Sequence, residues 1–230
     1  MANVNHPDTQ EIEMKASQLI QTLVALIPVA AGSAFAQTSG TPNDPFLQRN
    51  INQQQRIEQG LQSGQLNTRE AARLEREESR VERMEAGAMK DGTVSAQEAQ
   101  RINQAQNRVS NDIYREKHDA QTGNPNSASS QRMQADVQRN INQQQRIQQG
   151  VNSGALTQRE AGRMERGEAH LNRMEARAGR DGHVGRFEQQ RLQHAENRQS
   201  GRIFREKHDG QGNSGNHSGQ GGGRQHLARR

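Results

Sequence analysis

The fold is decided by the stretch Gln48-Arg49-Asn50-Ile51-Asn52-Gln53-Gln54-Gln55-Arg56-Ile57, because the same ten residues return in the same order at 138–147. When the chain is shifted by ninety positions, residues 48–120 lie on residues 138–210 without a gap and match at 43 of 73 positions. Identity at this level and at one fixed spacing means that a single folding unit occurs twice. The sequence therefore predicts a tandem duplication.

The two copies define the expected domain boundaries. The first helical module is expected over residues 45–119 and the second over residues 137–209, and both close on Arg-Glu-Lys-His-Asp. Between them, residues 120–136 are rich in Ser, Asn, Gln and Gly, which is the composition of a disordered linker. Residues 210–230 form a tail rich in Gly, His and Arg, for which we also expect disorder.

Each module is expected to contain three helices, so the predicted fold class is all-α. In the first module, one helix runs over about 45–59 and ends at Gly60, a second follows the capping residue Asn67, and a third follows Ser95. No segment alternates with a period of two, so no sheet is expected. The second helix carries an apolar stripe for the core, made of Ala71, Leu74, Val81, Met84 and Ala88.

Composition limits both the core and the chemistry. Only 29% of the residues are hydrophobic and 2% aromatic, so only small cores between helices are expected. The chain has no cysteine, which excludes disulfides, thiolate metal sites and cysteine nucleophiles. Its 31 basic and 26 acidic residues are interspersed, a pattern typical of solvated helix faces. Because we expect the carboxylates on those faces, and no nucleophile elbow, phosphate loop or metalloprotease motif is present, we predict that the chain is not an enzyme.

The N-terminal segment predicts export. Residues 1–36 end in Ala34-Phe35-Ala36, a small-x-small cleavage pattern, after an apolar run too short to span a bilayer. Because residues 1–13 are acidic and polar, we expect translation to start at Met14, with Lys15 as the positive flank. The expected mature chain lies in the periplasm of a bacterium or is secreted. It then has no transmembrane segment and no nucleic-acid partner, and its partner is a protein or a metal ion.

A shorter motif recurs inside each module. Gly64-x-Leu66-x-x-x-Glu70 returns twenty-eight positions later with Gly, Val and Glu, and both motifs recur in the second module. The motif resembles the second half of an EF-hand calcium loop, in which a glycine makes the turn and a glutamate closes on the metal. The resemblance implies metal ligands at six carboxylates, which are Asp91, Glu98, Asp181, Glu188, Glu70 and Glu160.

The first half of each loop departs from the EF-hand pattern. Gly87 and Met89 stand where the first and third acidic ligands belong, and Arg177 and Gly179 stand there in the second module. We therefore expect weak binding of Ca²⁺ or another divalent or trivalent cation; the alternative is that the glycines and glutamates only shape and cap turns. The pattern is also similar to one in uncharacterised exported proteobacterial proteins, a resemblance that implies no activity.

Two further functions remain open. Leu156-Thr157-Gln158-Arg159-Glu160 resembles the Leu-Thr-x-x-Gln motif of the Spy and CpxP family, which implies a periplasmic chaperone or stress protein. Histidines suit Zn, Cu and Ni, so the second module and the tail are candidates for transition-metal handling. For His118 and His208, at equivalent places, the favoured explanation is interaction with the dipole at a helix C-terminus. The other histidines considered are His170, His183, His194, His217 and His226.

Overall fold

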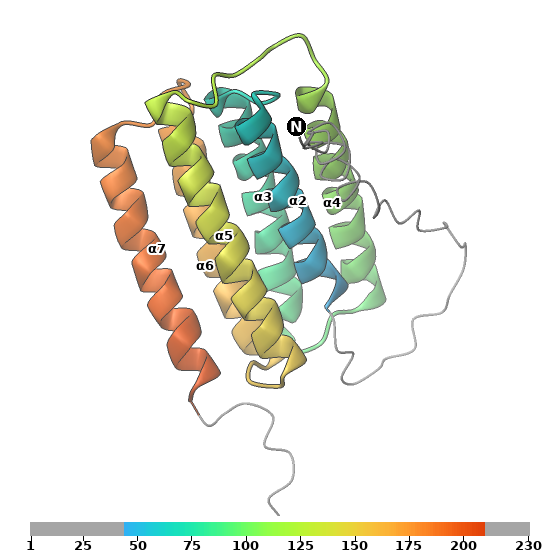
Figure 1. Ribbon diagram of the computed structural model, residues 1–230. Helices are drawn as coiled ribbons and strands as arrows, with labels where there is room; N and C mark the ends of the chain where they lie inside the picture. The colour runs from blue at the N-terminus through green and yellow to red at the C-terminus, as the bar shows by residue number, and fades with distance from the viewer. Residues whose placement is uncertain (1–43, 210–230) are drawn as a thin grey trace, which may run out of the picture. The chain divides into compact units, whose positions relative to one another are not determined.

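The computed structural model describes residues 44–209, which form six α-helices and one short 3-10 turn (Figure 1). The elements are α2 (Pro45–Ser63), α3 (Thr68–Ala88), η1 (Met89–Asp91), α4 (Ala96–Lys117), α5 (Ala128–Asn152), α6 (Gln158–Ala178) and α7 (Arg186–Lys207). No strand occurs within 44–209, so the all-α prediction is confirmed. The signal peptide expected at 1–36 and the tail at 210–230 lie outside the described residues.

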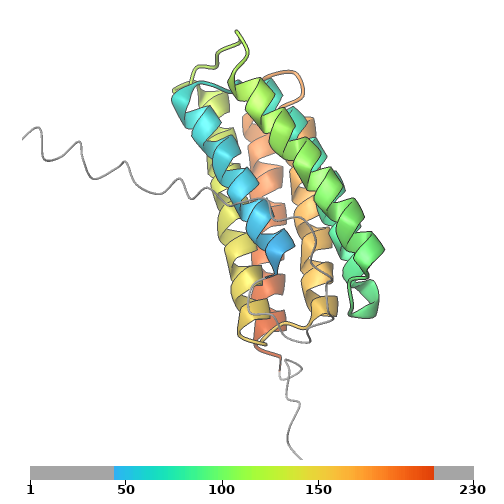
Figure 2. The same ribbon diagram turned by 90° about the vertical axis from the view of Figure 1, so that its right-hand side faces the viewer.

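The two modules, α2 to α4 and α5 to α7, pack against each other through equivalent helices. Helix α3 lies along α6, and α2 lies along α5. Helix α4 covers α2 and α3 on one side, and α7 covers α5 and α6 on the other (Figure 1). In Figure 2, α4 faces the viewer and the second module lies behind it. The largest apolar cluster draws on both modules, including Leu74, Val81, Met133, Val137 and Leu192.

The segment between the modules is shorter and more ordered than its composition predicts. Helix α5 begins at Ala128, so the expected linker over 120–136 is wrong for its second half. Ser127 starts the helix by accepting a hydrogen bond from the backbone of Ser130, and Met133 is fully buried in the core. The first half is also held, because the Gly123 backbone N–H donates to the Gly64 carbonyl at 2.8 Å.

The turn glycines adopt the backbone that the repeated motif predicts. Gly64 and Gly92 have φ of 75° and 94°, and their equivalents Gly154 and Gly182 have 71° and 88°. Residues other than glycine rarely adopt this conformation. Gly60, by contrast, does not end its helix as expected: α2 continues to Ser63, and the missing side chain of Gly60 makes room for Leu66, whose atoms lie 2.6 Å from where a Cβ would be.

One position of the predicted apolar stripe is wrong. Met84 is 39% exposed, whereas Leu74 and Val81 are buried as expected. The buried face of α3 is not purely apolar, and Met84 lies outside it. This face also includes four glutamates, Glu75, Glu78, Glu82 and Glu85. None of the described helices is long and apolar enough to cross a membrane.

Candidate cation-binding site

Four of the six predicted ligands hold turns together in this structure. Asp91 Oδ1 accepts a hydrogen bond from the Thr93 backbone at 3.0 Å, and Asp181 Oδ1 accepts one from the backbone of His183 at 2.9 Å. The side chains of Glu98 and Glu188 each accept a hydrogen bond from the residue that precedes their own helix, α4 or α7. Glu98 Oε2 accepts from Ser95 N at 3.0 Å, and Glu188 Oε2 accepts from Gly185 N at 2.8 Å. These bonds are helix caps and turn contacts.

Arginine side chains from the opposite module donate hydrogen bonds to backbone carbonyls of the same two turns. Arg159 donates to the Asp91 carbonyl at 2.9 Å, and Arg69 donates to the Asp181 carbonyl at 3.0 Å. A guanidinium at this place repels a metal ion. Within the described residues, neither Asp91 nor Asp181 joins a group of three acidic or histidine side chains.

The other two predicted ligands, Glu70 and Glu160, are brought together with further carboxylates. Glu70 meets Glu116 and Asp119, and each of the three offers an oxygen within 4.8 Å of the others; we call them the Glu70 cluster. At the equivalent place in the second module, the same arrangement forms the Glu160 cluster, whose members are Glu160, Glu206 and Asp209. Each cluster joins the start of one helix (α3 or α6) to the C-terminal end of the next α-helix in its module (α4 or α7).

Local structure fixes the buried member of the Glu70 cluster. Glu70 is the third residue of α3, and its Oε2 accepts a hydrogen bond from the Asn67 backbone at 2.9 Å while Asn67 caps the helix in return. This leaves Oε1, which is buried and has no hydrogen-bond donor among the described residues; the same holds for Glu116 Oε2. Burial raises the pKa of Glu70, and the nearby charges of Asp119 and Glu116 raise it further.

Arginines distinguish the two clusters. In the Glu70 cluster, Arg73 lies 2.7 Å from Glu116 Oε1 and leaves the other oxygen of that carboxylate unpaired. In the Glu160 cluster, Arg163 lies 3.8 Å from Glu160 Oε1 and 4.0 Å from Glu206 Oε2, so one guanidinium serves two of the three acids. The Glu70 cluster is therefore the better candidate for a cation.

Sequence reasoning missed Glu116, Asp119, Glu206 and Asp209. They belong to the Arg-Glu-Lys-His-Asp element that ends both modules. Two acids kept in a five-residue element were the available signal, but their contact with Glu70 and Glu160 is tertiary and has no local pattern.

The interior of the bundle is a second feature that the sequence did not predict. Glutamates occupy the buried face of α3 at spacings of three, four and three, which keep them on one side of a helix. The expectation that carboxylates alternate with arginines on exposed faces is wrong for this set, the carboxylate core. Its members are at most 1% exposed, and they are Glu75, Glu78, Glu82, Glu85, Asp136, Glu165, Glu168, Glu175 and Glu196.

Amide side chains meet these acids in pairs. Gln54 Nε2 donates to Glu75 Oε2 at 2.9 Å, and the equivalent Gln144 Nε2 donates to Glu165 Oε2 at 3.2 Å. In both pairs, the second oxygen of the acid and the oxygen of the amide are buried and have no donor within the described structure. A proton on the carboxyl group would bridge those two oxygens and complete a ring of two hydrogen bonds. The geometry of both pairs therefore favours a protonated, neutral carboxyl group on the glutamate.

The pKa values of the carboxylate core agree with this geometry. Burial raises the pKa of Glu75 to about 7 and that of Glu168 to about 8. Burial, followed by the charge of Glu196, raises the pKa of Asp136 to about 8. Burial and the charges of Glu85 and Glu168 raise the pKa of Glu165 well above its ordinary value. These groups hold protons at a pH where surface glutamates are ionised.

The histidines form no comparable site in the described part of the chain. His118, His170, His183, His194 and His208 are all exposed, and neither acidic cluster includes one. His118 Nδ1 lies 2.7 Å from the Tyr114 carbonyl, and its ring stacks on that of Tyr114; His208 repeats both contacts with Phe204. His217 and His226 lie outside the described residues.

Comparisons with known proteins give no family: no family model matches the chain, and no curated protein or solved structure is significantly similar to it.

Proposed function

We propose that this chain is a non-catalytic binding protein that takes up Ca²⁺ or a lanthanide ion at the Glu70 cluster, and more weakly at the Glu160 cluster. The observation that carries the proposal is the convergence of three carboxylates at equivalent places in both modules, together with a buried, unpaired oxygen on Glu70 in the first module. An ion there would satisfy Glu70 Oε1 and Glu116 Oε2 and relieve the mutual repulsion of the three acids.

The donor set selects the class of ion. All three ligands are carboxylate oxygens, which suit hard cations such as Ca²⁺, Mg²⁺ and Mn²⁺ rather than Zn²⁺ or Cu⁺. Three ligands leave about half of a calcium coordination sphere to water, so the affinity for Ca²⁺ is expected to be weak. Three negative charges balance a trivalent ion, and we therefore expect lanthanides to bind more tightly than Ca²⁺, and Ca²⁺ more tightly than Mg²⁺.

The only tyrosine provides a direct assay for the first module. Tyr114 lies on α4, two residues before Glu116 and five before Asp119, whereas Phe204 takes its place in the second module. Excited tyrosine transfers energy to nearby Tb³⁺, so Tb³⁺ emission in the full chain reports on the Glu70 cluster. We expect saturable emission that La³⁺ displaces at low concentration and Ca²⁺ at higher concentration.

Charge-neutral variants test the ligands. Glu116→Gln with Asp119→Asn should lower the Tb³⁺ affinity at least tenfold, and Glu206→Gln with Asp209→Asn should leave the tyrosine-sensitised signal unchanged. Glu98→Gln is the matched control, because Glu98 only caps a helix in this structure. Equal binding by the Glu116/Asp119 variant, or loss in the Glu98 variant, would refute the assignment and return the site to the EF-hand-like loops.

Export and the two alternative functions remain proposals that the same protein can test. We propose a periplasmic or secreted location because residues 1–36 match the pattern of a signal peptide. Transition-metal handling predicts Zn²⁺ or Cu²⁺ binding that survives the Glu116/Asp119 variant. A chaperone role predicts protection of an unfolded client from aggregation, and the exposed rings of Phe187, Phe204 and Tyr114 are the apolar surface available for it.

A further inference from the structure

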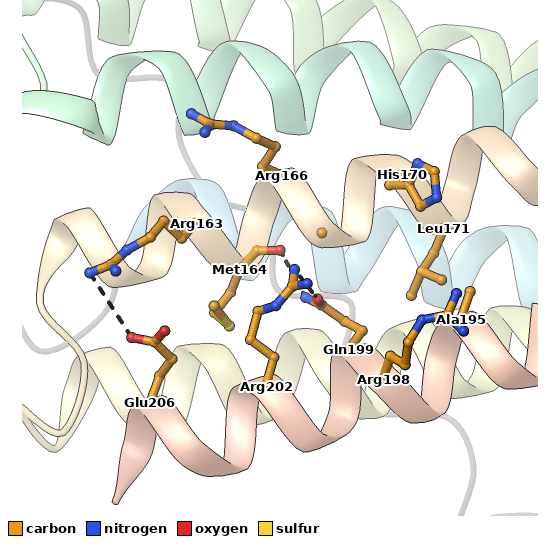
Figure 3. A pocket seen from close by; sticks show the side chains of 11 residues that line it. Arg163, Met164, Arg166, His170, Leu171, Ala195, Arg198, Gln199, Arg202 and Glu206 are labelled. Carbon is orange, nitrogen blue, oxygen red and sulfur yellow. Dashed lines mark hydrogen bonds and ion pairs between the residues drawn. The ribbon is translucent and has the colours of Figure 1, made fainter. Parts of the chain in front are cut away.

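A groove of about 490 Å³ lies between α6 and α7 on the surface of the second module (Figure 3). In Figure 3, Arg198 and Arg202 rise from α7 toward α6, and Arg163 reaches from α6 toward Glu206 at one end. Arg166 and His170 stand on the α6 side. The groove is therefore lined by four arginines and a histidine against a single acid.

Most of this positive charge has no partner. Arg166, His170 and Arg198 make no ion pair or side-chain hydrogen bond with any described residue. Arg163 lies 3.8 Å from Glu160 Oε1 and 4.0 Å from Glu206 Oε2, and Arg202 donates only to the neutral amide oxygen of Gln199 at 3.3 Å. Guanidinium groups without an acidic partner along a recess attract an anion and can offer it charge-assisted hydrogen bonds.

The floor of the groove is fixed by a buried side chain. Gln199 is 3% exposed, and its Nε2 donates to the Met164 carbonyl at 3.0 Å and to Glu168 Oε1 at 2.9 Å. A Cβ on Gly167 would lie 2.1 Å from Gln199 Oε1, so this glutamine can occupy the floor only because residue 167 is a glycine. Gln199 in turn holds the Arg202 guanidinium at the groove.

The equivalent surface of the first module carries different charges. At the places of Gly167 and Arg202 it has Glu77 and Asp112, and these two acids share a hydrogen bond while Asp112 also pairs with Arg115. The four arginines at the equivalent surface thus face three acids in the first module, but one acid in the second. The two copies therefore differ at this surface, which carries more acids in the first module and a larger excess of positive charge in the second.

We propose that the arginine groove, lined by Arg163, Arg166, His170, Arg198 and Arg202, binds a phosphate group carried by a larger molecule, either a soluble phosphate ester or a lipid headgroup. The planar guanidinium donors match the oxygens of phosphate. The volume lies in the range of small-molecule sites and exceeds what a single phosphate needs. This anion site shares Glu206 and its partner Arg163 with the Glu160 cluster, and it shares no residue with the Glu70 cluster.

The test uses the full chain in low-salt, phosphate-free buffer. Calorimetric titration with inorganic phosphate and with glucose 6-phosphate measures the soluble arm. Sedimentation with phosphatidylglycerol vesicles, compared with phosphatidylcholine vesicles, measures the lipid arm. We expect binding in at least one arm, with the phosphate ester tighter than inorganic phosphate if the ligand is soluble.

Two variants and one control decide the site. Arg198→Gln and Arg202→Asp, the second of which installs the first-module residue, should each weaken binding about tenfold or more. Arg108→Gln changes the first-module equivalent of Arg198 and should leave binding unchanged. No binding in either arm overturns the proposal. An equal loss in Arg108→Gln and Arg198→Gln also overturns it, because it would show attraction to net charge alone. Thermal unfolding of each variant confirms that it is folded.

Discussion

Raising the pH from 5 to 9 should destabilise this protein progressively, because its core acids are held neutral. A carboxyl group whose pKa is higher in the folded state than in the unfolded state binds more protons when folded. Its stabilising contribution is complete below the unfolded value of 4.5 for Glu75, Glu85 and Glu168, and it is lost as the pH rises through their folded values of about 7 to 8. Stability should therefore fall between pH 5 and pH 9.

The magnitude follows from the shifts. Moving the pKa of Glu75 from 4.5 to about 7 corresponds to about 3 kcal/mol, and moving that of Glu85 or Glu168 to about 8 corresponds to about 5 kcal/mol each. Each such group loses about 1–2 kcal/mol of this between pH 6 and pH 8. A domain is stable by only about 5–15 kcal/mol, so the effect should dominate its pH profile.

Urea unfolding followed by circular dichroism at pH 5, 6, 7, 8 and 9, with a chelator present, measures this profile. Glu75→Gln isolates one group, because its amide donates to Gln54 Oε1 as the protonated acid would and does not titrate. We expect this variant to be more stable than the parent by about 3 kcal/mol at pH 8 and by less than about 1 kcal/mol at pH 5. Glu98→Gln, at an exposed cap, should show no such gain. A parent profile that is flat or rises from pH 5 to pH 8 would refute the neutral-core argument.

Three further outcomes are expected. Gly64→Ala should cost more stability than Gly182→Ala, about 2 against 1 kcal/mol in urea unfolding, because both require positive φ but only at Gly64 would a Cβ meet a carbonyl, that of Gly123 at 2.9 Å. Asn172→Glu should cost about 3 kcal/mol or more at pH 8, since it removes the donor to Glu82 and adds a buried acid. Tyr114→Phe should abolish Tb³⁺ emission while calorimetry shows unchanged La³⁺ affinity, and a lost affinity would mean that emission had reported a structural change.

Features set by local chemistry were predictable from the sequence. The glutamates three residues after Asn67, Ser95 and Thr157 close capping boxes as their spacing indicates, because a cap involves only the first turn of a helix. The positive φ of Gly64 and Gly92 follows equally from the turn that the motif describes. The number and order of the helices were predictable as well, because a unit that occurs twice repeats its helices in the same order.

Features set by packing between distant helices were not predictable in the same way. A glutamate at a heptad position reads as a surface residue until its partner is known, and the partner of Glu75 is an amide twenty-one residues earlier on another helix. Glu70 and Glu116 are likewise separated by most of a module. The spacing of Glu75, Glu78, Glu82 and Glu85, kept at three of four places in the second module, was the signal of a buried face, but composition argued against it.

The contact between Glu82 and Asn172 favours pairing of the first module with the second. These residues are equivalent under the ninety-residue shift, yet they touch: Asn172 Nδ2 donates to both oxygens of Glu82, at 3.0 and 2.9 Å. A symmetric pair of first modules would place two glutamates face to face at this point, and a pair of second modules would place two asparagines there without an acid to bind. At this point only the mixed pair gives a buried carboxylate an amide donor, so the difference between the copies favours packing of α3 on α6 over packing of two like modules.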